Sequence, residues 1–367
     1  MRLNLPLLDR REIEEIEKVL QTGYLTQGPK VAEFENLIKQ MTGIRHAFAT
    51  SSCTTALHLS LVALGIQAGD EVLVQDFTFP ATANVVAQQG ALPVLVDINL
   101  DTFTVDLNDL EKKLSSRTRA IIPVDTFGCS ADMDPINEMA ARYGIPVLED
   151  AACAFGTMYK DRFCGGLSTV GCFSFHPRKA ITTGEGGMIL TNDDNLAERI
   201  SLLRSHGGVR TGFWFEYEEA GFNYRLSDVQ GAMGIAQMEK VPYILKRKRE
   251  LAISLTRRLQ AVKGIRTPVE PAWGGHVYQS YVILVDEGID RDELIRRMRE
   301  QDVECTIGTY ACHDQPFFQR TYGYKTGQLK NSHAAFTRGV ALPFYPQLTD
   351  ADLDRIQEAL EYSINRL

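Results

Sequence analysis

The order of apolar and polar residues between about residues 45 and 192 alternates between two periods. Short apolar runs indicate buried strands at His46–Thr50, Glu71–Gln75, Pro93–Asp97, Ala120–Val124, Val147–Glu149, Gly171–Phe175 and Met188–Thr191. Apolar residues at a helical spacing lie between them at Thr55–Leu64, Ala81–Gln89, Leu107–Leu114 and Asp134–Tyr143. Strands that alternate with helices on this scale form mainly parallel sheets, so the pattern predicts an α/β fold.

The pattern changes in the last third of the chain. A long helical stretch precedes an alternating run typical of a strand, and two further helical patterns follow, at Pro242–Val262, Val277–Val285, Asp290–Gln301 and Asp350–Asn365. A chain of 367 residues also exceeds the size at which a single hydrophobic core stops growing. We therefore expect a large domain at residues 1–244, with an N-terminal helical segment, and a smaller α+β domain at residues 245–367.

Composition narrows the classes of partner. The formal net charge is −8, which argues against nucleic acid or an anionic membrane surface as the main partner. The N-terminus leads directly into a charged amphipathic segment without an apolar signal-peptide core, and no stretch approaches the ~20 apolar residues of a membrane span. We expect a cytoplasmic protein.

The cysteines indicate reduced thiols. They are odd in number and contain no C-x-x-C pair, at Cys53, Cys129, Cys153, Cys164, Cys172, Cys305 and Cys312. This usage fits the cytosol better than a disulfide framework or a zinc site, so no metal is expected.

Polar residues after the predicted strands are the candidates for ligand binding, because such sheets bind ligands beyond the carboxyl ends of their strands. Lys179 follows one strand, in a run that leads into the glycine-rich loop Gly184–Gly187, and Asp150 ends another. An amine that can form a Schiff base and an acid that can protonate a pyridine nitrogen together indicate a pyridoxal-phosphate (PLP) site. We expect burial and cationic neighbours to lower the pKa of Lys179.

Two further strand ends leave alternatives open. Thr54 and Thr55 open a helix after Ser51-Ser52, where they suit either a phosphate at the helix N-terminus or ordinary capping. Phe77 and Phe79 project similarly from an extended segment, so either one is a candidate to stack on a pyridine ring or to lie in the core.

Three polar side chains next to these positions have competing roles. Glu149 is the other candidate acid, but it points to the opposite face of the strand from Asp150. Ser174 is within reach of a phosphate, and His176 either packs near the site or orients the loop. For Lys179 itself the ordinary alternative is a surface lysine.

Taken in order, these motifs resemble the DegT/DnrJ/EryC1/StrS family of PLP-dependent sugar aminotransferases, of the fold type I (aspartate aminotransferase-like) superfamily. The resemblance covers essentially the whole chain. It rests on the segments Thr26–Lys30 with Phe34-Glu35, Ser52–Leu57, Gly69–Val72, Thr78–Thr82, Glu149–Ala152, Ser174–His176 with Lys179, Gly184–Gly187 and Gly221–Asp228.

The resemblance implies a role for each matching residue. Lys179 carries the Schiff base and Asp150 pairs with the pyridine nitrogen, while Phe79, rather than Phe77, stacks on the ring. Asn223 reaches the cofactor phosphate of the neighbouring subunit, with Arg225 as its companion, which implies a homodimer with shared active sites. The phosphate is held by Thr54, Thr55 and Ser174.

Two segments depart from the family pattern. Cys153 stands where many members have glutamine, and a thiol is a poorer hydrogen-bond donor to the ring hydroxyl. Val124–Gly128, which contains Asp125-Thr126, replaces the commoner His-Leu pair and is a region that shapes substrate choice.

The resemblance implies ping-pong transamination from glutamate to a keto sugar linked to a nucleoside diphosphate. Candidate substrate contacts are Tyr24, Thr26, Lys30, His176, Arg225, Tyr310 and His313. For Tyr310 and His313 the alternative is packing within the C-terminal domain. Competing functions are a PLP-dependent sugar dehydratase, in which histidine replaces the lysine, and a non-catalytic regulatory protein of the same fold; Lys179 weighs against both.

Overall fold

The structure is a computed structural model that describes residues 1–367. Seven strands form its central sheet. The sheet consists of a three-stranded part and a four-stranded part. Two parallel bridges join them, between Ile121 and Val147 and between Val124 and Asp150. The order is β4 (Leu92–Val96), β2 (Glu71–Gln75), β5 (Thr118–Ile122), β6 (Leu148–Asp150), β9 (Val170–Ser174), β10 (Gly187–Thr191) and β1 (His46–Thr50). Only β10 runs antiparallel to its neighbours, so the predicted mainly parallel α/β sheet is confirmed.

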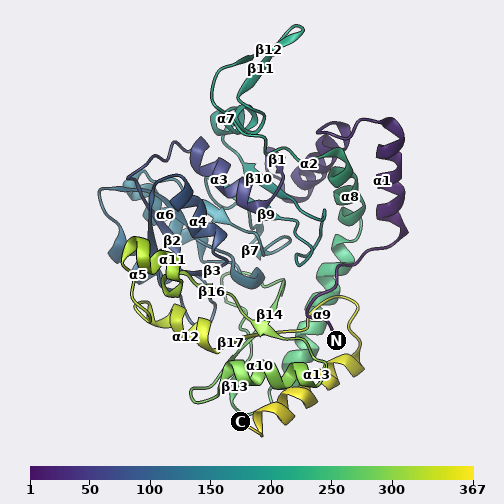
Figure 1. The fold of residues 1–367 in the computed structure, drawn as a ribbon, viewed down its shortest axis with the longest axis vertical. Helices are drawn as coiled ribbons and strands as arrows, with labels where there is room; N and C mark the ends of the chain where they lie inside the picture. Colours follow the sequence, from purple (N-terminus) through teal and green to yellow (C-terminus); the bar gives the residue numbers. More distant parts are fainter.

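Helices cover both faces of this sheet (Figure 1). They are α1 (Arg10–Thr22), α2 (Pro29–Thr42), α3 (Cys53–Ala63), α4 (Ala81–Gln88), α5 (Leu107–Lys113), α6 (Met133–Tyr143), α7 (Asp194–Arg204) and α8 (Asp228–Met238). Of these, α1, α2 and α8 lie together on one side of the sheet. On α8, a Cβ at Gly234 would lie 2.9 Å from the ring of Phe34, so glycine lets α8 approach α2 closely. Asp228 fixes the same contact, since its carboxylate accepts the N–H groups of Gly28 and Val31.

A second sheet lies in the C-terminal part, at the bottom of Figure 1. Its strands are β13 (Ile265–Arg266), β14 (Tyr281–Val285), β17 (Gly339–Leu342) and β15 (Thr306–Ile307), with helices α9 (Val241–Leu259), α10 (Arg291–Glu300), α11 (Pro316–Tyr322), α12 (Lys330–Arg338) and α13 (Asp350–Ile364). The strand expected from Val277 begins only at Tyr281, because Tyr278 adopts a left-handed backbone conformation with φ 51°. Neither α9, the longest helix, nor any other is long and apolar enough to cross a membrane.

The apolar side chains of the C-terminal sheet form their own core, which runs from Leu251 on α9 to Leu360 on α13. We infer from this core that the domain boundary lies within the first turns of α9. The first residues of the chain belong on the C-terminal side of that division, because Met1 packs against this core and the N–H of Phe344 donates to Leu3.

A two-residue ribbon joins the two parts. β16 (Tyr310–Ala311) pairs antiparallel with β3 (Phe77–Thr78), so that Tyr310 lies opposite Thr78. The short turn helix Cys312–Asp314 follows β16 directly, and a second one, Thr126–Gly128, follows β5. The ribbon places C-terminal residues beside the carboxyl end of β2.

The sequence patterns did not predict two hairpins. One is β7 (Met158–Tyr159) with β8 (Arg162–Phe163). The other, β11 (Gly208–Thr211) with β12 (Trp214–Tyr217), projects away from the rest of the chain at the top of Figure 1. The strands and the turn of this projecting hairpin expose large apolar side chains, namely Val209, Phe213, Trp214, Phe215 and Tyr217.

Candidate active site

Lys179 lies in a tight turn that follows β9. Its N–H donates to the carbonyl of His176 at 2.8 Å, and the loop folds back so that Phe175 bonds to Gly186. The side chain is half-buried, and Nζ donates to Sγ of Cys153 at 3.0 Å. The surface-lysine alternative is therefore wrong for this position.

The charge environment of Lys179 differs from the sequence expectation. Burial lowers the pKa of this amine, but the Cys153 thiol, and to a smaller degree the Asp150 carboxylate, outweigh burial and leave the pKa raised. We expected a lowered pKa from cationic neighbours, and that expectation is wrong for the cofactor-free chain, because the groups that act on Nζ are thiols and a carboxylate.

Asp150 ends β6 and is almost fully buried. Its Oδ2 accepts the Thr82 hydroxyl at 2.7 Å, and its Oδ1 accepts the N–H of Ala152 at 3.1 Å. Burial raises its pKa, and these hydrogen bonds oppose the rise. Glu149, by contrast, uses its carboxylate to hold the N–H groups of Gly165 and Leu167, so it serves the backbone on the other face of the strand.

The turn between β1 and α3 has the form of an anion site. Ser52 caps α3, with its Oγ accepting the N–H of Thr55 at 3.1 Å, while the Thr55 hydroxyl donates to the Ser52 carbonyl at 2.8 Å. The first-turn N–H groups of Cys53 and Thr54 have no acceptor within the helix and suit a phosphate. Capping and phosphate binding are thus compatible here, with Ser52 providing the cap.

Glycine and serine on the neighbouring strands complete this turn. A Cβ at Gly187 would lie 2.5 Å from the Ser52 carbonyl oxygen, so only glycine lets β10 approach the turn. Ser174 is buried at the carboxyl end of β9, and its Oγ accepts only a long hydrogen bond, 3.5 Å, from the N–H of His176.

The two candidate phenylalanines occupy different environments. Phe77 is fully buried and packs against Phe103 and Phe127. The side chain of Phe79 is 66% exposed and meets the ring of Tyr310 edge-on, with centroids 6.5 Å apart. Phe79 is therefore the one whose ring face is open to a ligand.

Asn223 and Arg225 lie beside the phosphate-type turn of their own chain. Arg225 bridges to Thr50, and Asn223 bridges to Ser205. The Arg225 guanidinium donates to the Ser205 hydroxyl at 2.9 Å and contacts a ring nitrogen of His206 at 3.2 Å. The Asn223 side chain is exposed.

The substrate candidates separate into accessible and occupied side chains. Tyr24 and Thr26 are exposed in the link between α1 and α2. Lys30 is neutralised by ion pairs with Glu33 at 2.9 Å and Glu15 at 3.5 Å. His176 is half-buried and uses Nδ1 to accept the N–H of Arg178, which supports a role in shaping the loop.

His313 is not accessible to a sugar. It is fully buried, with Nδ1 2.6 Å from Asp76 Oδ2 and its backbone N–H on Asp76 Oδ1 at 2.7 Å. Burial lowers its pKa, but Asp76 and Asp314 outweigh burial and raise it. His313 therefore has a packing role, although not within the C-terminal domain alone, because it joins the segment after β16 to the end of β2. Tyr310, which is half-buried beside Phe79, remains a candidate contact.

The sequence reasoning missed Lys248. This residue of α9 is 2% exposed, and Nζ donates to the Gln279 carbonyl at 2.8 Å; the Gln279 amide in turn donates to the Arg178 carbonyl at 2.7 Å. Burial lowers the pKa of Lys248 to about 7. In the sequence it stands within Lys246-Arg247-Lys248-Arg249, where nothing distinguishes it from a solvated helix face.

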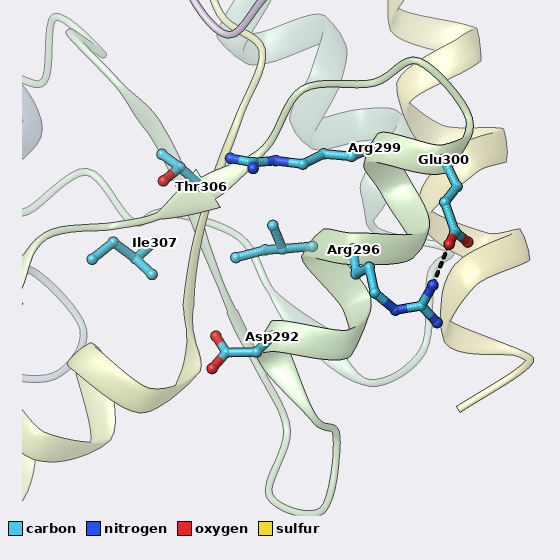
Figure 2. A pocket seen from close by; sticks show the side chains of 7 residues that line it. Asp292, Arg296, Arg299, Glu300, Thr306 and Ile307 are labelled. Carbon is cyan, nitrogen blue, oxygen red and sulfur yellow. Dashed lines mark hydrogen bonds and ion pairs between the residues drawn. The ribbon is translucent and has the colours of Figure 1, made fainter.

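An open pocket lies away from these residues. It has a volume of about 590 Å³ and lies between α10 and β15 in the C-terminal part (Figure 2). Its charged groups are already paired, as in Arg296 with Glu293 and Glu300, and Arg299 donates to the Cys305 carbonyl at 2.9 Å. None of the candidate active-site residues lines it.

The residues around Lys179 fit PLP. Asp150 is a buried carboxylate suited to a pyridinium N–H, Phe79 offers an open ring face, and the α3 turn offers backbone N–H groups to a phosphate. The Cys153 thiol contacts the Lys179 amine, so it is not available to the ring hydroxyl of PLP in this arrangement.

The comparison with protein families agrees with this geometry. The model of the DegT/DnrJ/EryC1/StrS aminotransferase family matches residues 6–361. The chain belongs to this family. It is therefore a PLP-dependent sugar aminotransferase.

Members of the DegT/DnrJ/EryC1/StrS family that resemble the chain cover almost its whole length. The spore coat polysaccharide biosynthesis protein SpsC of Bacillus subtilis is 37% identical, over 97% of this chain and 95% of its own. Among solved structures, DesV of S. venezuelae, in complex with a ketimine intermediate, has a TM-score of 0.92 and 31% identity over 99% of both chains. Helicobacter pylori PseC, an aminotransferase involved in the biosynthesis of pseudoaminic acid, has a TM-score of 0.95 and 26% identity over 100% of this chain and 99% of its own.

Proposed function

We propose that this aminotransferase takes an amino group from glutamate and transfers it to a keto sugar linked to a nucleoside diphosphate, in two half-reactions. The observation that carries the chemistry is the electrostatic contact of Lys179 with Asp150, whose carboxylate is joined through the Thr82 hydroxyl to the segment of the exposed Phe79. The relatives named for polysaccharide and pseudoaminic acid biosynthesis support an activated sugar as the acceptor.

Bound PLP supplies a ring that accepts electrons from the donor's α-carbon. Asp150 holds the proton of the ring nitrogen, and the Thr82 hydroxyl and the Ala152 N–H keep its carboxylate in place. Lys179 Nζ moves the proton between the donor's α-carbon and the cofactor, which requires its neutral amine. The Cys153 contact stabilises the charged amine in the cofactor-free chain, so cofactor binding must displace that contact.

The candidate acceptor contacts are accessible aromatic and polar residues. Phe79 and Tyr310 meet at the ribbon between β3 and β16, and Tyr24 and Thr26 lie exposed in the link between α1 and α2. Aromatic faces and hydroxyls suit a sugar or a nucleotide base, which supports the proposed acceptor.

We also propose a cytoplasmic homodimer with shared active sites. The projecting hairpin exposes Phe213 (99%), Trp214 (64%) and Tyr217 (69%), a patch that is costly on a free chain in water. A few residues later the chain reaches exposed Asn223 beside the turn of α3. A second copy that covers the hairpin would therefore come close to the phosphate end of the site. The unpaired cysteines support a reducing compartment.

The test uses purified protein with PLP, first with glutamate and then with a panel of keto sugars. We expect glutamate to yield 2-oxoglutarate and pyridoxamine phosphate, and the aminated cofactor to react with nucleotide-linked keto sugars and not with the same sugars free. Reaction with other amino acids but not glutamate would overturn the donor. A dehydrated sugar without an amino group would favour the dehydratase alternative, and absence of any half-reaction would favour the regulatory one.

A further inference from the structure

Cys153 differs from every other cysteine of the chain in two ways. It is the only one that is not buried, since Cys53, Cys129, Cys164, Cys172, Cys305 and Cys312 are all inside the protein. It is also the only one that contacts an amine, with Sγ 3.0 Å from Nζ of Lys179. Peroxides oxidise accessible thiols through the thiolate, so Cys153 is the thiol of this chain that a peroxide reaches most readily.

The backbone on both sides of this contact is fixed. A Cβ at Gly128 would lie 3.0 Å from the carbonyl of Cys153, so the chain after Asp150 is held against the turn that follows β5. The turn of Lys179 is closed by its hydrogen bond to His176. The two reactive atoms therefore stay neighbours while the flexible lysine side chain can shorten their separation.

We propose that Cys153 and Lys179 form an oxidation site at which a peroxide links the two side chains through a sulfur–nitrogen bond. The thiolate attacks hydrogen peroxide and becomes a sulfenic acid, with release of hydroxide, which takes a proton from the Lys179 ammonium. The neutral amine then attacks the sulfenic sulfur. The S–N bond forms, the S–O bond breaks, and water leaves.

The cofactor controls this reaction because both processes use the same nitrogen. While Lys179 is bonded to PLP, no amine is free to attack the sulfur. In the cofactor-free protein, and after the donor's amino group has passed to the cofactor, the amine is free and the link can form. A small thiol reverses the link by attacking sulfur, which gives a mixed disulfide and returns the amine.

The test is intact-mass and peptide mass spectrometry of the cofactor-free protein after treatment with hydrogen peroxide. We expect a product lighter than the protein by two hydrogen atoms, with the peptides of Cys153 and Lys179 joined and trypsin no longer cutting after Lys179. Dithiothreitol should restore the original mass. Oxygen addition at Cys153 without any joined peptide would overturn the proposal.

Two variants and one cofactor state serve as controls. Cys153→Ser and Lys179→Ala should each lose the joined product completely, and circular dichroism shows whether they are folded. PLP-loaded protein should form none until glutamate is added. Equal amounts with and without PLP would overturn the proposal. Because no sugar or product amine is measured, failure here leaves the proposed donor and acceptor untouched.

Discussion

Lys179 and Lys248 are both withdrawn from bulk water, yet their amines have different hydrogen-bond partners and their pKa values shift in opposite directions. Lys179 has a thiol at 3.0 Å and is within the influence of the Asp150 carboxylate, and its pKa is raised. Lys248 has one carbonyl at 2.8 Å, and its pKa falls to about 7. The comparison indicates that a directly hydrogen-bonded thiol offsets the effect of burial on the pKa of an amine, whereas a carbonyl does not.

The largest expected effect separates the two lysines by activity. Lys179→Ala removes the amine that forms the Schiff base and moves the proton, so transamination should fall by at least ~10³-fold. Lys248→Met should keep measurable activity. The measurement is formation of 2-oxoglutarate from glutamate. Comparable loss in both variants would contradict the division of roles.

Asp150→Asn tests the carboxylate that acts on Lys179. An amide cannot hold the ring proton as a carboxylate does, so the half-reaction should slow roughly 10²–10³-fold while PLP still binds. Single-turnover spectroscopy of bound cofactor measures this. Glu149→Gln is the neighbouring control, and it should affect stability rather than the spectrum, because Glu149 holds backbone N–H groups.

Lys248 should make stability depend on pH. Its pKa is about 7 in the folded chain and near 10.5 when unfolded, so between these values the unfolded state binds more protons and stability rises with pH. Below pH 7, burying the charged amine of Lys248 lowers the free energy of unfolding by on the order of several kcal/mol. Lys248→Met should therefore gain stability relative to wild type most clearly at acidic pH, measured as Tm.

Lys246→Met is the matched control on the same helix, since the Lys246 side chain is 80% exposed. It should leave the pH profile of Tm unchanged. A wild-type profile that Lys248→Met does not alter would show that the amine of Lys248 is solvated.

The smallest expected effect concerns Cys153. A serine hydroxyl does not ionise as a thiol does, so Cys153→Ser should lower the pKa of Lys179 in the cofactor-free protein. The rate of PLP binding as a function of pH reports when this amine becomes neutral, and its midpoint should move to lower pH. A midpoint that moves upward would contradict the assigned cause.

Strand patterns predicted the central sheet well, because both faces of its strands are buried and their apolar runs are continuous. The carboxyl ends of those strands then located Lys179, Asp150 and the α3 turn. The choice of Phe79 over Phe77 needed the resemblance, since an extended segment gives both the same direction, and exposure now separates them.

The sequence could not predict features that depend on tertiary contacts. His313 stayed open between a sugar contact and packing because nothing in its own segment reveals Asp76, which comes from a strand end more than 230 residues earlier. Lys248 lies among charged neighbours in the sequence, yet its side chain is buried and donates to the carbonyl of Gln279, about 30 residues later in the chain. The pKa of Lys179 was misjudged because its partners are set by the loop after Asp150.

The ribbon of β3 and β16 has a consequence for how this enzyme changes its preference for sugars. Phe79 and Tyr310 stand on strands that hydrogen-bond to each other, and the Asp76–His313 pair secures the same spot. A swing of the C-terminal domain that parted the two rings would have to break both. We therefore expect the proposed sugar site beside these rings to be rigid, and a change of preferred sugar to come from substitution of side chains on the ribbon rather than from a domain movement.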